Sequence, residues 1–246
     1  MNSLSGKVIV VTGGSGLIGR AIISDLLQNG ATVFNADITE ENISEENYIY
    51  CNVTDKVSVE NAIALVLNKF DKIDGWINNA YPRTSDWGAR FENITVESWK
   101  TNVDLQMNSI FICCQAVLEV MKKQKSGSIV NVSSIYGIVG PDFTLYDGTG
   151  MTMPAAYSAI KGGIVNFTRY LASYFGHLNV RINCVSPGGI FDNQNETFVF
   201  NYERKVPMKR MGIPEDISPA ISFLMSNGSA YITGQNIIID GGWTSI

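Results

Sequence analysis

Two residues of the chain have types and a spacing that could support proton transfer, Tyr157 and Lys161 in "YSAIK". On a helix, side chains four positions apart share a face, so the lysine ammonium can lie beside the phenol. A free tyrosine titrates near pH ~10, and a nearby cation favours its phenolate. The pair could therefore act as a general acid and base closer to neutral pH. Because a Tyr and a Lys at this spacing also meet by chance, the motif needs support from elsewhere in the chain.

A glycine-rich segment near the start of the chain, "VTGGSGLIGR" at 11–20, could bind phosphate. Apolar and β-branched residues precede the glycines and a helical pattern follows them, which predicts a strand, a tight turn and a helix. Glycines let a pyrophosphate approach the backbone, and the helix N-terminus offers free N–H groups and a partial positive charge. The spacing fits both G-x-G-x-x-G and T-G-x-x-G-x-x-G, and each predicts a dinucleotide site.

An acidic residue, Asp37, ends the next strand-like segment, eighteen positions after Gly19. A carboxylate there can accept hydrogen bonds from an adenosine ribose and repels a 2′-phosphate, which favours NAD over NADP. The following residue is Ile38 rather than an arginine, so the usual partner of that phosphate is missing. The alternative is that Asp37 is a surface residue that caps residues 39–42.

Strand-like and helix-like segments alternate along the chain, which is typical of a parallel sheet covered by helices on both faces. The predicted strands are 7–12, 32–36, 48–52, 75–78, 128–132, 181–185 and 235–239, and the predicted helices are 17–29, 56–70, 96–123, 155–175 and 214–226. Residues 39–47 leave room for a small helix only. We expect one Rossmann-like, doubly wound α/β domain over residues 1–246, with a mostly parallel seven-stranded sheet.

Two long segments break this alternation, residues 136–154 and 187–212. Each follows a predicted strand, so both should lie at the carboxyl edge of the sheet, where open α/β folds bind their ligands. Long irregular loops in a compact domain are more often functional than idle.

Composition excludes several classes of function. The net charge is −5, and no basic run is longer than "KKQK" at 122–125, so we expect no nucleic-acid partner. No apolar run reaches the ~20 residues of a membrane helix, and no leader is apparent, so we expect a cytoplasmic protein without a membrane partner. The four cysteines form no metal-ligand pattern, and we expect reduced, buried thiols and no metal site.

Seven segments in the right order resemble the short-chain dehydrogenase/reductase family, in its compact single-domain type. They are "TGGSGLIG" (12–19), "CNVTD" (51–55), "INNA" (77–80), "IVNVSS" (129–134), "YSAIK" (157–161), "NCVSPGGI" (183–190) and "ITGQNIIIDGG" (232–242). The resemblance implies a Rossmann fold, a nicotinamide cofactor and hydride transfer between an alcohol and a ketone.

The resemblance also implies roles for four residues. Tyr157 would exchange a proton with the substrate oxygen, and Lys161 would lower the pKa of Tyr157 and hold the nicotinamide ribose. Ser134 would hydrogen-bond the substrate oxygen, with Ser133 as the alternative. Asn102, in "WKTNVDLQ", would hold a water that links the lysine to solvent.

Further residues follow from the same motifs. The cofactor-binding residues are expected to be Gly13, Ser15, Gly16, Leu17, Ile18, Asp37, Asn52, Val53, Asn79, Ala80, Tyr157, Lys161, Pro187, Gly188 and Ile190. The substrate-binding residues are expected to be Tyr81, Arg83, Ser134, Tyr146 and Asp192.

The chain departs from the family pattern in four places. Leu17 stands where the compact type usually has glycine, which gives the glycine spacing of the extended type. Tyr81 replaces the glycine that usually follows Asn-Asn-Ala, and Asp192 replaces a threonine. Ser134 and Tyr157 are 23 positions apart, more than usual, because of an insert at 141–153 that should loop over the cleft.

We expect an oxidoreductase that prefers NAD(H) and acts on a polar small molecule, sugar-derived or acidic, because the insert is polar and Arg83 adds a cation. Two alternatives are an extended-type epimerase or dehydratase that retains its NAD, and a non-catalytic nucleotide-binding regulator. Relatives pair the long helices that correspond to 96–123 and 155–175, so a homodimer or homotetramer is expected.

Overall fold

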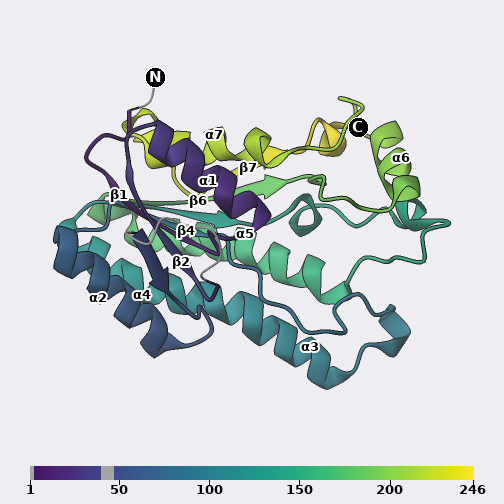
Figure 1. The fold of residues 1–246 in the computed structure, drawn as a ribbon, viewed down its shortest axis with the longest axis horizontal. Helices are drawn as coiled ribbons and strands as arrows, with labels where there is room; N and C mark the ends of the chain where they lie inside the picture. Colours follow the sequence, from purple (N-terminus) through teal and green to yellow (C-terminus); the bar gives the residue numbers. More distant parts are fainter. Residues whose placement is uncertain (1–2, 40–46) are drawn as a thin grey trace.

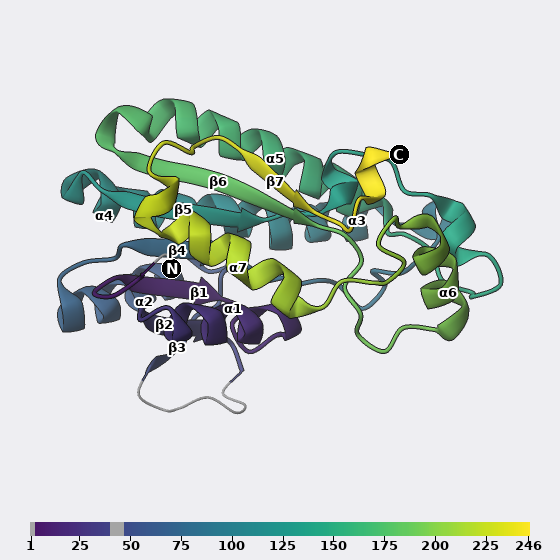
Figure 2. The same ribbon diagram turned by 90° about the horizontal axis from the view of Figure 1, so that it is seen from above.

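A computed structural model describes residues 3–39 and 47–246 and contains a seven-stranded parallel sheet (Figures 1 and 2). The strand order is β3-β2-β1-β4-β5-β6-β7. The strands are β1 Val8–Thr12, β2 Thr32–Asp37, β3 Tyr48–Tyr50, β4 Gly75–Asn78, β5 Gly127–Val132, β6 Val180–Pro187 and β7 Asn236–Ile239. The order changes direction between β1 and β4, and such a switch point is where doubly wound sheets bind ligands. The predicted fold class is confirmed.

Helices cover both faces of the sheet, as Figure 1 shows. The helices are α1 Leu17–Gln28, α2 Lys56–Phe70, α3 Val96–Val103, α4 Ser109–Gln124, α5 Ala155–Phe175, α6 Glu196–Lys205 and α7 Pro214–Met225. One buried core lies under α1 and α7, and another lies under α2, α4 and α5. A π-helical turn, η3 Asp104–Asn108, joins α3 to α4.

The observed elements follow most of the predicted ranges, but β3 ends two residues early, at Tyr50, and the helix predicted at 96–123 is divided by η3. The sequence analysis left 187–212 irregular, but α6 forms within it, capped by the Asn195 side chain, which accepts from Thr197 N at 2.9 Å. The small helix expected at 39–47 falls largely on residues outside the described ranges. Strand β6 runs two residues beyond the prediction, to Pro187.

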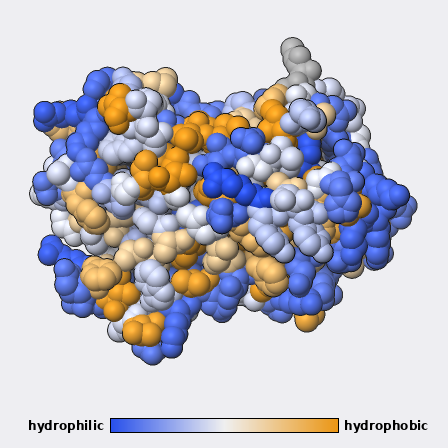
Figure 3. All heavy atoms as spheres, turned by 180° about the vertical axis from the view of Figure 1, so that it is seen from behind, coloured by the Kyte–Doolittle hydropathy of each residue, from blue (hydrophilic) through white to orange (hydrophobic). Residues whose placement is uncertain are grey.

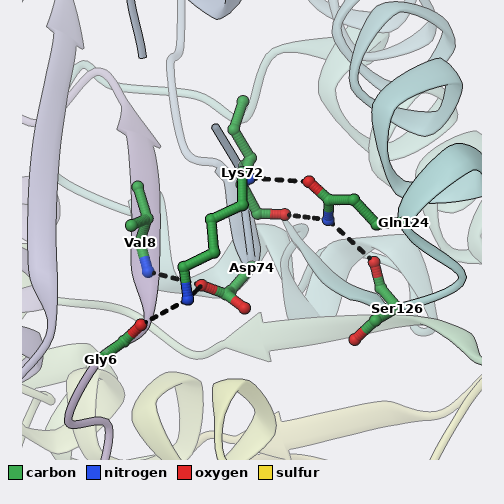
Figure 4. Close-up of polar contacts among 7 residues, drawn as sticks. Gly6, Val8, Lys72, Asp74, Gln124 and Ser126 are labelled. Carbon is green, nitrogen blue, oxygen red and sulfur yellow. Dashed lines mark hydrogen bonds and ion pairs between the residues drawn. The ribbon is translucent and has the colours of Figure 1, made fainter. Parts of the chain in front are cut away.

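Polar contacts at the amino edge of the sheet fix the start of β4 (Figure 4). Val8 N donates to Asp74 Oδ2 at 2.8 Å, and Lys72 Nζ lies 2.9 Å from the same oxygen. The Gln124 side chain accepts from Ile73 N and donates to Ile73 O, both at 2.9 Å, and so ties the end of α4 to the same segment. These bonds fix the relative positions of β1 and β4, whose carboxyl ends meet at the opposite edge.

The insert is an ordered part of the protein rather than a free excursion. It contains the short helix η5, Phe143–Tyr146, in which Leu145 is completely buried against α6. Asn201 donates to Leu145 O at 3.1 Å, and Lys205 forms an ion pair with Asp142. The insert and α6 therefore form one small body beyond the carboxyl edge of the sheet (Figure 2).

Within the described residues, one helical stretch, 96–124, is long and apolar enough to cross a membrane by length and composition. In the structure its second half, α4, packs against α2 and strands β4 and β5. This helix thus contributes its apolar side to the core of the fold.

Candidate active site

A cleft of about 560 Å³ lies at the carboxyl ends of β1, β2 and β4. Ten of the predicted cofactor residues line it, namely Gly13, Ser15, Gly16, Leu17, Ile18, Asp37, Asn52, Val53, Asn79 and Ala80. Three of the predicted substrate residues, Tyr81, Arg83 and Asp192, line it too.

The glycine turn at the floor of the cleft has no room for a side chain at Gly13. Gly13 has φ of 65°, and a Cβ there would lie 2.7 Å from the Ala80 Cα. Helix α1 begins directly afterwards at Leu17, and its N-cap, Gly16, provides no side-chain cap, so backbone N–H groups of the first turn are open to an anion. This cradle fits the pyrophosphate of a dinucleotide. Leu17 is 43% exposed, so the side chain that departs from the compact pattern displaces no packed neighbour.

The Asp37 carboxylate is almost buried and held in place by backbone donors. Its Oδ2 accepts from Ser15 N at 2.9 Å, and its Oδ1 accepts from Ile38 N at 2.7 Å and Thr39 N at 3.1 Å. Asp37 is thus bonded to the backbone as far as residue 39 and also lines the cleft, while the rest of the segment 39–42 that it was expected to cap lies outside the described residues. Among the described residues Oδ2 accepts this one hydrogen bond, which leaves it able to accept from a ribose hydroxyl.

The loop after β4 is bonded to the glycine turn. Thr12 Oγ1 accepts from Asn79 N at 3.0 Å and from Ala80 N at 3.2 Å, and Asn79 Nδ2 donates to Gly13 O at 2.9 Å. Two cofactor segments that are more than 60 residues apart in the chain therefore form one rigid edge of the cleft.

Lys161 is buried on α5, and its ammonium contacts few polar groups. Nζ donates to Val132 O at 3.0 Å and lies over the Tyr157 ring, 5.5 Å from its centroid. Burial lowers the pKa of Lys161 to about 8, and the nearby Cys184 thiol opposes this shift. Burial also raises the pKa of Tyr157. The pKa of Tyr157 is thus raised rather than lowered as expected from the spacing, because desolvation outweighs the opposing interaction with Ser134.

Geometry distinguishes the two serines at the end of β5. Ser134 hydrogen-bonds the Tyr157 side chain, which opposes the rise in the pKa of Tyr157. Ser133 Oγ instead donates to Lys161 O at 2.8 Å and so anchors the α5 backbone. The insert thus leaves Ser134 and Tyr157 in contact despite their separation in the chain.

Asn102 does not reach this cluster through its side-chain contacts. Its Nδ2 donates to Thr84 Oγ1 at 2.7 Å and to Ser98 O at 2.9 Å, and its Oδ1 accepts from Thr84 N at 3.1 Å. These bonds use the amide to fix the loop after β4. One turn further along, Gln106 is 4% exposed, and the described residues offer no partner to either polar atom of its amide. Gln106 lies on η3, which packs against α5.

The rest of the predicted residues lie around the cleft but do not line it. Gly188 and Ile190 line a neighbouring hollow of about 140 Å³, and Gly188 N donates to Ile239 O at 2.9 Å. Pro187 ends β6 next to them. Tyr146 packs on Phe198, with ring centroids 5.3 Å apart, and lies close enough to Tyr157 to act on its charge.

Sequence reasoning missed Trp87. Its ring lies edge to face with Tyr81 at 5.9 Å and with Tyr157 at 6.2 Å. The one related signal in the sequence was Tyr81, an aromatic residue at a position where the family usually has glycine. That signal did not indicate that Trp87, six residues later, would pack against the same ring.

A parallel sheet with a dinucleotide cradle next to a buried Tyr–Lys–Ser cluster defines a nicotinamide-dependent oxidoreductase of the Rossmann type. A family model described as enoyl-(acyl carrier protein) reductase matches residues 13–244. The chain is 34% identical over 253 residues to post-translational flagellin modification protein A of Campylobacter coli, covering 98% of this chain and 99% of that protein.

Two further comparisons agree. The chain is 34% identical over 255 residues to the 3-oxoacyl-[acyl-carrier-protein] reductase FabG of Thermotoga maritima, covering 97% and 98% of the two chains. A short-chain dehydrogenase structure from Leptospira borgpetersenii with bound NAD+ superimposes with a TM-score of 0.90, at 34% identity and with 98% and 94% of the chains covered. The chain belongs to the short-chain dehydrogenase/reductase family and is an NAD(P)-dependent oxidoreductase that acts on CH–OH or C=O groups.

Proposed function

We propose that this protein interconverts an alcohol and a ketone with NAD(H), on a hydroxylated and acidic small molecule such as a sugar derivative. The observation that carries the proposal is the meeting of Ser134, Tyr157 and Lys161 beside the cleft. The bound nicotinamide supplies or accepts the hydride. In ketone reduction, Tyr157 gives its proton to the substrate oxygen, Ser134 holds that oxygen, and the Lys161 cation stabilises the phenolate left behind.

The preference for NAD(H) rests on Asp37. Its carboxylate lines the cleft and would repel a 2′-phosphate. Among the described residues that line the cleft, Arg83 is the one cation, and it lies beside Tyr81, 5.6 Å from the ring centroid. Arg83 is therefore assigned to the substrate end and not to the adenosine end.

The substrate class rests on the groups at that end. Arg83 matches a carboxylate, since its guanidinium offers paired donors. Ser134, Tyr157 and the nearby phenols of Tyr136 and Tyr146 can exchange hydrogen bonds with substrate hydroxyls. The relative named for flagellin modification supports a substrate outside the acyl-carrier and steroid classes.

A water that links the catalytic lysine to solvent is better assigned to Gln106 than to Asn102. The Asn102 amide is already bonded to Thr84 and Ser98, whereas the buried Gln106 amide has a donor and an acceptor without partners. Buried polar groups without protein partners commonly bind ordered water.

A homodimer or homotetramer in the cytoplasm is also proposed. Phe111, Phe167, Tyr170 and Tyr174 form a continuous aromatic row on α4 and α5, with successive centroids 6.1 to 6.3 Å apart. Apolar residues gather over the central part of the back of the molecule (Figure 3). Light scattering on the wild type and a Tyr170→Glu variant tests this, and a monomeric wild type contradicts it.

The test of function is a panel of sugar acids, sugar ketones, 3-oxoacyl thioesters and hydroxysteroids, each with NAD(H) and NADP(H), followed by absorbance. Tyr157→Phe serves as the blank that retains the fold. We expect turnover of the hydroxylated acids with NAD(H), and an Arg83→Gln variant should raise KM for acidic substrates by about tenfold. Turnover confined to thioesters or steroids contradicts the substrate class. Tightly retained NAD without net NADH formation would favour the epimerase alternative.

A further inference from the structure

Three aromatic rings meet around the catalytic pair. Tyr81 lies 5.8 Å from Tyr157 with an interplanar angle of 87°, and Trp87 lies edge to face with both. Edge-to-face packing is the favoured geometry of aromatic pairs, because a positive ring edge meets a negative ring face. Tyr81 comes from the loop after β4 and Tyr157 from α5, so the cluster connects two separate walls of the site.

The Lys161 ammonium lies against two of these rings. Nζ is 5.3 Å from the Tyr81 centroid and 5.5 Å from the Tyr157 centroid, both within the range of cation–π attraction. Its one described hydrogen bond goes to Val132 O, although an ammonium has three donors. Only 7% of Lys161 is exposed, so the Tyr81 ring replaces a part of the electrostatic stabilisation that water would otherwise give.

Tyr81 is itself held from two sides. Its side chain hydrogen-bonds those of Trp87 and Arg83, and the Arg83 guanidinium also lies over its ring. Further titratable groups act on the pair from other elements. They are Cys184 from β6, which acts on Lys161, and Tyr136 and Tyr146 from the segment after β5, whose own pKa values Tyr157 helps to raise. The Tyr81 ring differs from these groups because it lies against both members of the pair, Tyr157 and Lys161.

We propose that Tyr81 is a positioning residue of the catalytic pair, whose ring holds the charged Lys161 ammonium against Tyr157. Loss of the ring makes the charged form of Lys161 less stable and leaves its side chain less firmly held beside Tyr157. Tyr157 then loses part of the cation that stabilises its phenolate. The apparent pKa of Tyr157 rises, which keeps the phenol protonated for reduction. The apparent pKa of Lys161 falls, so its charge is lost at lower pH and the pH range of ketone reduction becomes narrower on the alkaline side.

Three variants distinguish the effect of the aromatic ring of Tyr81 from the effects of its bulk and of its hydroxyl. Tyr81→Leu keeps an apolar cover without π electrons, Tyr81→Phe keeps the ring, and Phe91→Leu is the control. Phe91 is 76% exposed in the same connection between β4 and α3 and contacts none of the cluster rings. The proposal rests on the oxidoreductase class and not on the substrate named above, so any ketone that is turned over serves the assay.

We expect Tyr81→Leu to lower kcat about tenfold and to narrow the pH profile of kcat by about one unit. Tyr81→Phe should retain turnover within about threefold, and Phe91→Leu should match the wild type. A wild-type profile for Tyr81→Leu overturns the proposal, because the ring would then act by bulk alone. A Tyr81→Phe variant as impaired as Tyr81→Leu overturns it too, because the hydroxyl would be responsible.

A readout without turnover distinguishes this proposal from the proposed substrate class. The Lys161 side-chain methylene protons, observed by NMR and assigned with a Lys161→Arg variant, should be shifted upfield by the neighbouring rings. The shift should shrink in Tyr81→Leu and persist in Tyr81→Phe. Unchanged Lys161 resonances in Tyr81→Leu overturn the proposal even if no substrate has been found.

Discussion

The two ends of the cleft hold their functional groups in different ways. At the adenosine end, most of the functional groups are backbone groups. They lie in the glycine turn, at the start of α1 and around Asp37, and they belong to β1, β2 and the turns that follow these strands. At the catalytic end, side chains from three separate segments, the loop after β4, the end of β5 and α5, pack against one another.

This difference has an energetic consequence. The adenosine end is built mostly from satisfied hydrogen bonds, with the buried Asn35 Oδ1 as an exception among its described polar groups, so its geometry and its stability largely agree. The catalytic end contains a buried ammonium and an amide without partners, which cost stability and are maintained by the surrounding packing. Substitutions at the adenosine end should therefore reduce both cofactor binding and stability. Substitutions at the catalytic end should reduce activity and increase stability.

The largest expected effect is that of Lys161→Met. Turnover should fall by about a thousandfold, since the proton-transfer machinery loses its cation. The pKa of Lys161 is about 8 in the folded protein against an ordinary 10.5, so the unfolded chain binds more protons between these values. Burying the charged Lys161 therefore lowers the free energy of unfolding by its largest amount below pH 8, and this effect disappears towards pH 10.5. Lys161→Met removes it, so the variant should be more stable by up to roughly 3 kcal/mol at pH 7.

Chemical denaturation at pH 7 and pH 10 measures this gain, which should be smaller at the higher pH. A variant that is less stable than the wild type at pH 7 would contradict the view that the catalytic end exchanges stability for activity.

Gly13→Ala, at the adenosine end, should lower stability, whereas Lys161→Met should raise it. The new Cβ meets the Ala80 Cα at 2.7 Å in a backbone with φ of 65°, so we expect a loss of about 2 kcal/mol and at least tenfold weaker NADH binding. Gly88→Ala is the control, because a Cβ there meets nothing within 4 Å. Thermal unfolding and fluorescence titration with NADH measure both effects, and normal NADH binding by Gly13→Ala would show that the turn is not the phosphate cradle.

Asn102→Leu and Gln106→Leu test the comparison within a single helical stretch. Asn102→Leu leaves the Thr84 N–H without its partner and should cost about 2 kcal/mol. Gln106→Leu removes two unpartnered atoms, so stability should hold or rise by about 1 kcal/mol, while turnover falls about tenfold. Denaturant midpoints and kcat distinguish them, and normal turnover in Gln106→Leu would remove Gln106 from the proton pathway.

The smallest expected effect is that of Asp37→Asn. Without the charge, the ratio of NADPH to NADH affinity should rise by about tenfold, chiefly through weaker NADH binding. Asp71→Asn is a matched control, because Asp71 has φ of 59°, a conformation that asparagine tolerates. Titration with both cofactors gives the ratio, and an unchanged ratio would mean that Asp37 serves only the backbone around it.

Contiguous motifs predicted most of the fold and the adenosine end. The period of apolar residues predicted the strands and helices, and the spacing of Gly13, Gly16 and Gly19 predicted the cradle, because these features depend on neighbours in the chain. The helix α6 was missed since its segment begins with glycines and polar residues, and its apolar side packs on the insert rather than on the sheet.

The sequence by itself determined the fold class, the dinucleotide cleft and the presence of Tyr157, Lys161 and Ser134, because local periodicity, glycine conformation and short motifs are properties of adjacent residues. Only the tertiary structure decided that the described residues offer Gln106 no partner, that Ser134 contacts the phenol, and that Tyr81 lies against Lys161 with Trp87 beside Tyr81 and Tyr157. Those relations join residues from separate elements, and burial, which sets their pKa values, exists only once the chain has packed.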